Sequence, residues 1–320
     1  MKAVVYTRYG SPGVLRLTDV PKPAPVANEL LINVRATTVN RTDCGFRQGD
    51  PYVVRLFAGL TRPKRPILGS EFAGVVDEVG PDVHSFRVGD EVFGLTGVAF
   101  GAHAEYLCLP DDAPVGVKPA GVGFDDAAAA CDGAMNALTH LRKAHVGPGQ
   151  RVLVYGASGS IGTAAVQLAV HLGADVTAVC GTRNVELVRS LGADTVIDYL
   201  KTDFTRDGPT YDLVLDAVGR SSFGRCRQLL KDDGVYSSTD LGPWDQNPLL
   251  DLATFIAGGR RVRMPIPRPR RDDVMFFGGL MEAGSYRPVI DRRYPLERLV
   301  EATRYVELGQ KTGNVVITVG

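Results

Sequence analysis

The chain has 320 residues, of which 36 are basic and 36 are acidic, and 44% are hydrophobic. A chain of this length can bury two domain cores, and this hydrophobic share is ordinary for a globular protein. The balanced charge gives no overall field that would attract nucleic acid or anionic lipid, and no apolar run approaches the ~20 residues of a membrane-spanning helix. The five cysteines are scattered without a CxxC pair, and the amino terminus lacks the apolar core of a signal peptide. We therefore expect a cytoplasmic protein with no nucleic-acid or membrane partner.

Two patterns follow one another along the chain. Residues 1 to about 118 contain short β-type runs separated by glycine and proline, which predicts a small β-rich domain. From Arg151 onward strands and helices alternate, which predicts a parallel sheet. The expected strands are 152–155, 176–180, 195–199, 211–216 and 234–238. Three helices are expected between them: one that begins near Ile161, one at 184–191 and one at 221–230. The basic segment 259–271 has alternating prolines, which place it at an edge of the sheet or outside it.

The segment Arg151–Gly162, RVLVYGASGSIG, passes from an apolar strand through small residues into a helix. Small residues let backbone N–H groups approach a pyrophosphate at the positive end of the helix. A second strand, Val176–Cys180, follows the helix, as in dinucleotide-binding folds. We therefore predict that this turn binds a dinucleotide, through Gly156, Ala157, Ser158, Gly159, Ser160, Ile161 and Gly162.

The residues at the end of the second strand indicate whether the dinucleotide is NAD(H) or NADP(H). An NAD site needs an Asp or Glu roughly twenty residues after the glycines, where it accepts hydrogen bonds from the ribose 2′-hydroxyl. The chain has Thr182 and Arg183 at this point, and a hydroxyl and a guanidinium suit a 2′-phosphate. Glu186 comes later, inside the next helix, and is a poor candidate for the ribose. We expect NADP(H), with the alternative that Arg183 is a solvated residue at a helix start.

Several motifs occur in order along nearly the whole chain: NRTD at 40–43, GSEFAGVVDEVG at 69–80, VGDEVFG at 88–94, the glycine turn, and a C-terminal segment that ends GNVVITV. Together they resemble the medium-chain dehydrogenase/reductase superfamily, and within it the zinc-independent quinone oxidoreductases related to zeta-crystallin. The resemblance implies an α/β protein with a GroES-like β-rich catalytic domain at 1–118 and 285–320. It also implies a Rossmann domain with a doubly wound parallel sheet at 119–284, an active site between the domains, and a homodimer.

Zinc alcohol dehydrogenases of this superfamily have a cysteine and a histidine where this chain has Asn40 and Ser70. Cys131 lies roughly at the third ligand position, but one thiolate cannot hold a tetrahedral zinc ion. No metal site is therefore expected. Glu71, which is kept without its metal partner, is interpreted as structural, holding a backbone group or an arginine. Without a Lewis acid to polarise an alcohol, hydride delivery to an acceptor that is already electrophilic is favoured.

The resemblance also suggests which side chains act. Asn40 could hydrogen-bond the nicotinamide ribose or a substrate carbonyl, or it could form an Asx turn. Tyr52 could donate a proton to the developing enolate oxygen, or it could be a surface or pocket-wall residue. Asn136 is expected to line the nicotinamide pocket and Tyr199 to lie near the ribose phosphate, unless they are a helix-surface residue and a strand-end aromatic. The backbone of Ala217, Val218 and Gly219 is expected to pass the nicotinamide ribose.

These observations predict a zinc-independent, NADPH-dependent oxidoreductase that transfers hydride to a quinone or an α,β-unsaturated carbonyl, a small electrophilic acceptor. One alternative is an NADPH-dependent reductase of aldehydes or ketones, which tightly bound zinc would favour. The other is a sensor or structural protein that binds NADPH without turnover, because proteins related to zeta-crystallin include lens proteins.

Overall fold

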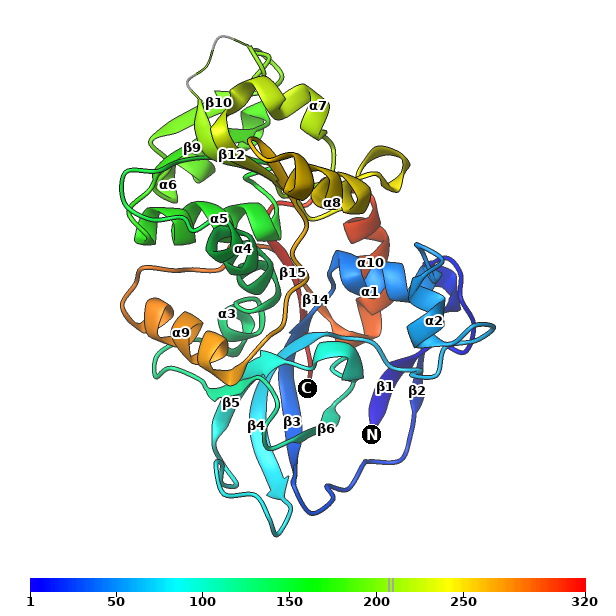
Figure 1. Cartoon of the computed structure of the whole chain (residues 1–320). Helices are drawn as coiled ribbons and strands as arrows, with labels where there is room; N and C mark the ends of the chain where they lie inside the picture. The colour runs from blue at the N-terminus through cyan, green and yellow to red at the C-terminus, as the bar shows by residue number, and fades with distance from the viewer. Residues whose placement is uncertain (207, 209) are drawn as a thin grey trace. The chain divides into compact units, whose positions relative to one another are not determined.

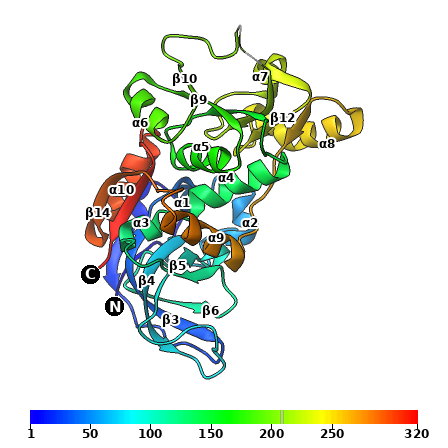
Figure 2. The ribbon, with the colours of Figure 1, turned by 90° about the vertical axis from the view of Figure 1, so that its left-hand side faces the viewer.

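A computed structural model describes residues 1–206, 208 and 210–320 of the chain. The polypeptide folds into two compact units, residues 1–132 with 269–320, and residues 133–268 (Figures 1 and 2). These limits differ from the domain boundaries expected at 118/119 and 284/285. Residues 269–284 belong to the first unit because the helix they contain packs on a strand of that unit, where a Cβ on Gly116 would lie 2.8 Å from the sulfur of Met275.

The first unit is built around a sheet in which β14, β15, β3, β4, β5 and β7 are neighbours in that order and β6 pairs with β3. The strands β1 and β2 form a separate antiparallel pair. The strands are β1 (Lys2–Val5), β2 (Arg16–Asp19), β3 (Glu29–Thr38), β4 (Glu71–Val79), β5 (Glu91–Leu95), β6 (Tyr106–Pro110), β7 (Val115–Val117), β14 (Ile290–Pro295) and β15 (Asn314–Thr318). The helices are α1 (Arg41–Gln48), α2 (Val54–Ala58), α3 (Phe124–Ala128), α9 (Arg271–Glu282) and α10 (Leu299–Glu307), with short 3₁₀ turns at Pro12–Val14, Gly97–Ala99 and Leu296–Arg298.

The C-terminal segment completes this sheet. The last strand, β15, runs antiparallel to β3, with Ile317 opposite Thr37, and it lies beside β14 on its other edge. Its residues Val315, Val316 and Ile317 are fully buried. The β-rich unit is therefore formed from both ends of the chain, as the resemblance implies.

The second unit is a six-stranded parallel sheet with the order β10-β9-β8-β11-β12-β13. Counted from β8, this is the 3-2-1-4-5-6 order of a doubly wound dinucleotide-binding sheet. The strands are β8 (Arg151–Tyr155), β9 (Asp175–Cys180), β10 (Thr195–Asp198), β11 (Tyr211–Asp216), β12 (Leu230–Ser238) and β13 (Arg261–Arg263). The helices are α4 (Asp132–Lys143), α5 (Ser160–His171), α6 (Val185–Ser190), α7 (Phe223–Cys226) and α8 (Asn247–Ala257), with 3₁₀ turns at Thr182–Asn184, Arg227–Leu229 and Pro243–Asp245. The expected α/β architecture is confirmed.

Most of the expected elements in this unit are present, and one differs. The segment 221–230 was expected to be a single helix, but only Phe223–Cys226 is α-helical, and a 3₁₀ turn leads directly into β12 at Leu230. Leu230 is fully buried and pairs with Tyr211, so sheet pairing takes it out of the helix. The basic segment lies at the sheet edge as expected, because β13 is the last strand in the order. Among the described residues, no helix is both long and apolar enough to cross a membrane.

A buried arginine ties the two ends of the chain together in the first unit. Arg47, on α1, is fully buried, and its guanidinium donates to the carbonyl oxygen of Gly10 and to the carboxylate of Glu307 on α10. The side chain of Glu307 is 22% exposed, so one partner of this ion pair is almost completely removed from water. The arginine therefore joins α1 both to the N-terminal segment and to α10.

We expect Arg47→Ala to lower the free energy of unfolding by about 3 kcal/mol, because it removes a fully buried side chain together with its packing, its hydrogen bond to Gly10 and its ion pair with Glu307. Denaturant unfolding followed by circular dichroism measures this change. Arg298→Ala is the matched control, since Arg298 pairs with Glu301 at the surface, with side chains 58% and 52% exposed. That variant should lose less than about 1 kcal/mol, and equal losses in the two variants would contradict the assignment.

Candidate functional site

The turn between β8 and α5 is closed by its own backbone. The N–H groups of Gly156 and Ala157 both donate to the carbonyl oxygen of Val179 at 3.0 Å. Gly156 has a positive φ of 81°. A Cβ on Gly162 would lie 2.2 Å from the carbonyl oxygen of Gly156, and one on Gly156 would lie 2.5 Å from a methyl of Val218. Two of the predicted glycines are therefore required by close packing, and they allow α5 to begin directly against the end of β8.

The start of α5 has further features of an anion site. Its N-cap is Gly159, and no side chain caps the helix. The start of α4 lies against it, because a Cβ on Gly133 would be 2.4 Å from the hydroxyl of Ser160. Figures 1 and 2 both show α4 and α5 side by side. Asn136 is half-buried on α4, one turn beyond this contact. The predicted residues 156–162 and Asn136 thus belong to neighbouring helix starts and the turn beside them.

The turn after β11 is organised by one buried carboxylate. Asp216 is fully buried and accepts hydrogen bonds from the N–H groups of Val218 at 3.2 Å, Gly219 at 2.8 Å and Ser221 at 2.8 Å. The carboxylate oxygen that accepts from Ser221 also accepts from the Tyr236 hydroxyl, at 3.1 Å. Since β11 lies next to β8, the predicted stretch 217–219 is at the same carboxyl edge of the sheet as the glycine turn. Asp216 fixes its backbone, and the sequence analysis did not assign that role.

Residues from two neighbouring strands meet after β9. Thr182 and Arg183 follow β9 and are exposed, and Tyr199 follows β10 and is 47% exposed. A Cβ on Gly181 would lie 3.3 Å from the Tyr199 hydroxyl, so these two segments are in contact. The hydroxyl of Thr182 donates to the carboxylate of Asp198 at 2.6 Å. Asp198, the last residue of β10, was not among the predicted site residues.

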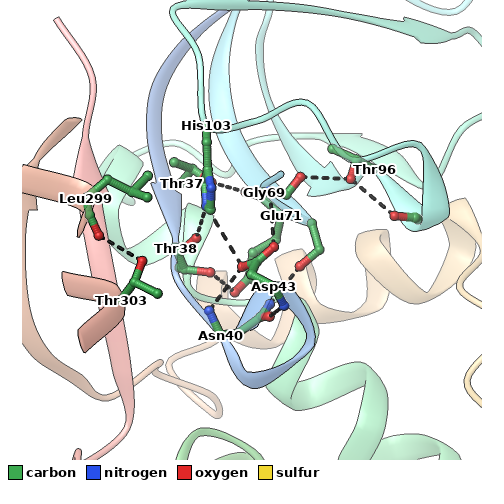
Figure 3. A network of polar contacts seen from close by, with 12 residues as sticks. Thr37, Thr38, Asn40, Asp43, Gly69, Glu71, Thr96, His103, Leu299 and Thr303 are labelled. Atoms are coloured by element: carbon green, nitrogen blue, oxygen red, sulfur yellow. Dashed lines mark hydrogen bonds and ion pairs between the residues drawn. The ribbon is translucent and has the colours of Figure 1, made fainter. Parts of the chain in front are cut away.

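A second polar network occupies the first unit (Figure 3). Asn40 is the N-cap of α1, and its side-chain oxygen accepts from the N–H of Asp43 at 2.9 Å in a capping box. Its amide nitrogen donates to the hydroxyl of Ser70 at 2.6 Å. Asp43 accepts in addition from the N–H of Gly69, and His103 donates to the carbonyl oxygen of Thr38 at 2.8 Å. Asn40 therefore forms the Asx-type cap that was its structural alternative, and one amide hydrogen remains for a ligand.

Glu71 lies at the centre of buried ionisable groups in this unit. It is 1% exposed and accepts hydrogen bonds from the Thr38 hydroxyl at 2.5 Å and from the N–H of Asp132 at 2.7 Å. It therefore holds a backbone group, as expected for a structural residue. Burial, and then the charge of Asp132, raises the pKa of Glu71 to about 8. Burial also raises the pKa of Asp132 and lowers that of Lys311, to about 8 for the lysine.

Tyr52 is not part of this network. It precedes α2, is 67% exposed, and its ring lies 5.0 Å from the guanidinium carbon of Arg55. Several apolar side chains around α2 are also exposed, among them Leu56 and Phe57. The phenol of Tyr52 is thus accessible to a small molecule, and proton transfer from Tyr52 to the enolate oxygen stays a prediction.

Comparison with known proteins gives consistent relatives. Residues 26–119 match the family model of the alcohol dehydrogenase GroES-like domain, and residues 191–317 match that of the zinc-binding dehydrogenases. The chain is 32% identical to the 2-methylene-furan-3-one reductase of Solanum lycopersicum, over 99% of this chain and 79% of that protein. It is 31% identical to the chloroplastic NADPH-dependent alkenal/one oxidoreductase of Arabidopsis thaliana, over 99% and 79%. The quinone oxidoreductase from Coxiella burnetii matches with a TM-score of 0.89 at 30% identity, over 100% of this chain and 99% of that one.

The raised pKa of Glu71 predicts how stability depends on pH. The folded state keeps a proton on Glu71 up to about pH 8, whereas an unfolded glutamic acid loses it near its ordinary pKa of 4.5. Unfolding between these values releases a proton, so a rise in pH favours the unfolded state, by up to about 1.4 kcal/mol per pH unit. The pKa of Asp132, raised to about 6, makes the slope steeper at lower pH. The lowered pKa of Lys311 acts in the opposite direction, but only above about pH 8, where the folded protein loses that proton. We expect Glu71→Gln to flatten the slope between about pH 6.5 and 8.

Denaturant titrations at several pH values measure this slope. Glutamine keeps one oxygen for the N–H of Asp132, and its amide can donate to the Thr38 hydroxyl, so the variant should fold. Glu78→Gln is the control, because Glu78 is on the same strand with its side chain 57% exposed. It should keep the wild-type slope, and a Glu71→Gln slope equal to wild type would rule out Glu71 as the cause.

Proposed function

This chain belongs to the medium-chain dehydrogenase/reductase superfamily, in its quinone oxidoreductase-like branch, and is an oxidoreductase; from this premise we propose that it reduces quinones or α,β-unsaturated carbonyls with NADPH. The observation that carries the proposal is the cradle of Gly156 and Gly162, in which a Cβ would collide with the backbone or with Val218. Glycines of this kind let the helix begin close against the strand, which presents the N–H groups of its first turn to a pyrophosphate. The names of the tomato and Arabidopsis relatives and of the Coxiella structure support these acceptor classes.

The residues present fit a nicotinamide dinucleotide. The first turn of α5 and the glycine turn would hold the pyrophosphate, and Asn136 and the backbone of 217–219 would orient the nicotinamide end. Thr182, Arg183 and Tyr199 would hold the ribose, with the guanidinium of Arg183 paired to the 2′-phosphate. One relative is by name NADPH-dependent, which supports this choice. When bound, the reduced nicotinamide supplies a hydride to the electrophilic carbon of the acceptor.

The chain itself must then stabilise the oxygen on which negative charge develops. The remaining amide hydrogen of Asn40 and the exposed phenol of Tyr52 are the donors that we propose for this oxygen. Tyr52 would also give the proton that completes the reduction. Most of the rate is expected from placing the acceptor against the cofactor, because hydride transfer to a conjugated carbonyl needs little further activation.

We also propose that the reaction is independent of zinc. Both polar groups of the Asn40 side chain are engaged, one with the N–H of Asp43 and one with the Ser70 hydroxyl. Burial raises the pKa of the Cys131 thiol well above its usual range, which disfavours the thiolate that binds metal. Within the part of the chain that the structure describes, no group of three or more His, Cys, Asp or Glu could hold a metal ion. The donors at these positions do not fit a tetrahedral zinc site.

We infer further that the protein is a cytoplasmic homodimer. Its five cysteines are all free, which fits a reducing compartment. The edge strand β13 pairs only with β12 in the sheet order, so its outer edge is available to a second copy. Beside it lies a hollow of about 550 Å³, whose lining includes the exposed apolar side chains of Leu252, Phe255 and Ile266. Leu249 and Ile256, on the same helix α8, are also exposed. An apolar patch of this kind next to an open edge is typical of an interface.

Oxidation of NADPH at 340 nm, with quinones, enones, aldehydes and ketones as acceptors and NADH in parallel, tests the activity. We expect turnover of quinones or enones by protein whose zinc content is far below one per chain, with Tyr52→Phe lowering kcat about tenfold or more. Arg55→Gln, which removes the neighbour of the Tyr52 ring but no proton donor, is the control. Turnover confined to aldehydes and ketones with stoichiometric zinc would favour the alcohol dehydrogenase-like alternative. Binding of NADPH without any turnover would favour a sensor or structural role.

Light scattering tests the dimer. We expect twice the chain mass of 34.3 kDa for the wild type, and the mass of a single chain for Ile256→Asp, because a buried carboxylate at an apolar interface is costly. Leu308→Asp is the control, since Leu308 is 64% exposed at the end of α10 in the other unit. A wild type that is monomeric at all concentrations would remove the homodimer from the proposal.

A further inference from the structure

The place proposed for the ribose, beside Thr182, Arg183 and Tyr199, also contains a carboxylate, which comes from β10. Asp198 is the last residue of β10, and the register of the sheet places it opposite Cys180, the last residue of β9. Its side chain is 11% exposed. One oxygen accepts from the Thr182 hydroxyl at 2.6 Å, and the other accepts from the N–H of Leu200 at 3.1 Å. The carboxylate is therefore held in place beside the first residues after β9.

This position matches the chemical requirement for binding a ribose with a free 2′-hydroxyl. In dinucleotide-binding sheets that take NAD, an acidic residue at the end of the second strand accepts a hydrogen bond from this hydroxyl. Here the second strand, β9, ends at Cys180 and is followed by Gly181, and neither residue carries a carboxylate. The neighbouring strand β10 ends at the same edge of the sheet and supplies the acid instead.

The surroundings keep Asp198 ionised. The hydrogen bond from Thr182 is the main cause of a pKa below the usual range, and the ammonium of Lys201, at 3.6 Å, also contributes. Tyr199 follows it directly and has its hydroxyl near Gly181. An ionised carboxylate only accepts hydrogen bonds, so it can bind a 2′-hydroxyl but not a 2′-phosphate, which it repels. Arg183, which follows Thr182, has the opposite preference.

We propose that Asp198 weakens the preference of this chain for NADPH over NADH, because its carboxylate accepts a hydrogen bond from the ribose 2′-hydroxyl of NADH and opposes the 2′-phosphate of NADPH. This inference rests on the proposed function in that it places the ribose beside Thr182, Arg183 and Tyr199. Asp198 limits the preference for NADPH that Arg183 produces, since the one hydroxyl hydrogen of Thr182 is donated to Asp198 itself. The protein accordingly binds both cofactors, with a smaller difference between them than its arginine alone would give.

The test is to measure the dissociation constants of NADPH and NADH by the fluorescence of the bound cofactors, for the wild type and for Asp198→Asn. We expect the variant to increase the preference for NADPH about tenfold, through tighter NADPH binding, weaker NADH binding, or both. Tenfold corresponds to about 1.4 kcal/mol, a reasonable size for removing one like charge near a phosphate at a protein surface. Adenosine 2′-monophosphate, used as a competitor, should also bind more tightly, whereas adenosine 5′-monophosphate should not.

Asp203→Asn is a closely matched control. Asp203 also accepts from a threonine hydroxyl, that of Thr205 at 2.7 Å, but it lies in the loop after β10 and is 42% exposed. This variant should change the cofactor preference less than twofold. Asp198→Ser keeps a side-chain acceptor for the N–H of Leu200 without the charge, and it should reproduce the effect if the asparagine variant folds poorly.

Arg183→Gln separates the role of Asp198 from the assignment of the cofactor site. If it weakens NADPH binding tenfold or more while both Asp198 variants leave the preference within twofold of wild type, the role of Asp198 is overturned and the cofactor site stands. If Arg183→Gln and the Asp198 variants all leave both dissociation constants unchanged, the ribose lies elsewhere. That result would overturn the cofactor assignment together with the present inference.

Discussion

The turn between β8 and α5 has no room for a side chain, and the rest of the second unit is arranged around this constraint. The carbonyl oxygen of Gly156 lies where a Cβ of Gly162 would be, and Val218 packs against Gly156 itself. Helix α5 can therefore begin close to the sheet, with the positive end of its dipole at the carboxyl edge of β8. The turn after β11 is held beside it by the backbone hydrogen bonds to Asp216, which come from Val218, Gly219, Arg220 and Ser221. Backbone groups, rather than reactive side chains, form most of this site.

The first unit depends on a different constraint, because it buries ionisable side chains away from water. Glu71 is completely enclosed, but each of its oxygens accepts a hydrogen bond, from Thr38 and from the N–H of Asp132. A buried carboxyl group with a raised pKa carries a proton at neutral pH, which avoids most of the cost of a buried charge. This explains why a glutamate can persist beside Asn40 and Ser70, where related zinc enzymes have ligands. Its role in joining β4 to the start of α4 requires no metal.

The two sites differ in what they offer chemically. The second unit provides a backbone cradle and charged groups for a dinucleotide, and the first provides few donors with free hydrogens. This is consistent with an enzyme whose cofactor performs the difficult step and whose protein groups position the acceptor and stabilise one oxygen. Beside Tyr52, the exposed side chains around α2 are apolar, among them Leu56 and Phe57. Small-molecule sites are lined mainly by apolar and aromatic side chains.

The sequence alone determined the parallel sheet, the glycine turn and the ordered motifs, because these follow from local patterns: apolar periodicity predicts the strands and helices, and small residues between a strand and a helix mark the turn. It did not reveal α8, whose apolar residues are largely exposed, nor did it show that 221–230 divides between a short helix and β12. Only the tertiary structure brought Asp198 to Thr182, because parallel strands that are adjacent in space end at one edge of the sheet, whatever their separation along the chain. The same holds for Arg47 and Glu307, whose ion pair joins residues 260 positions apart.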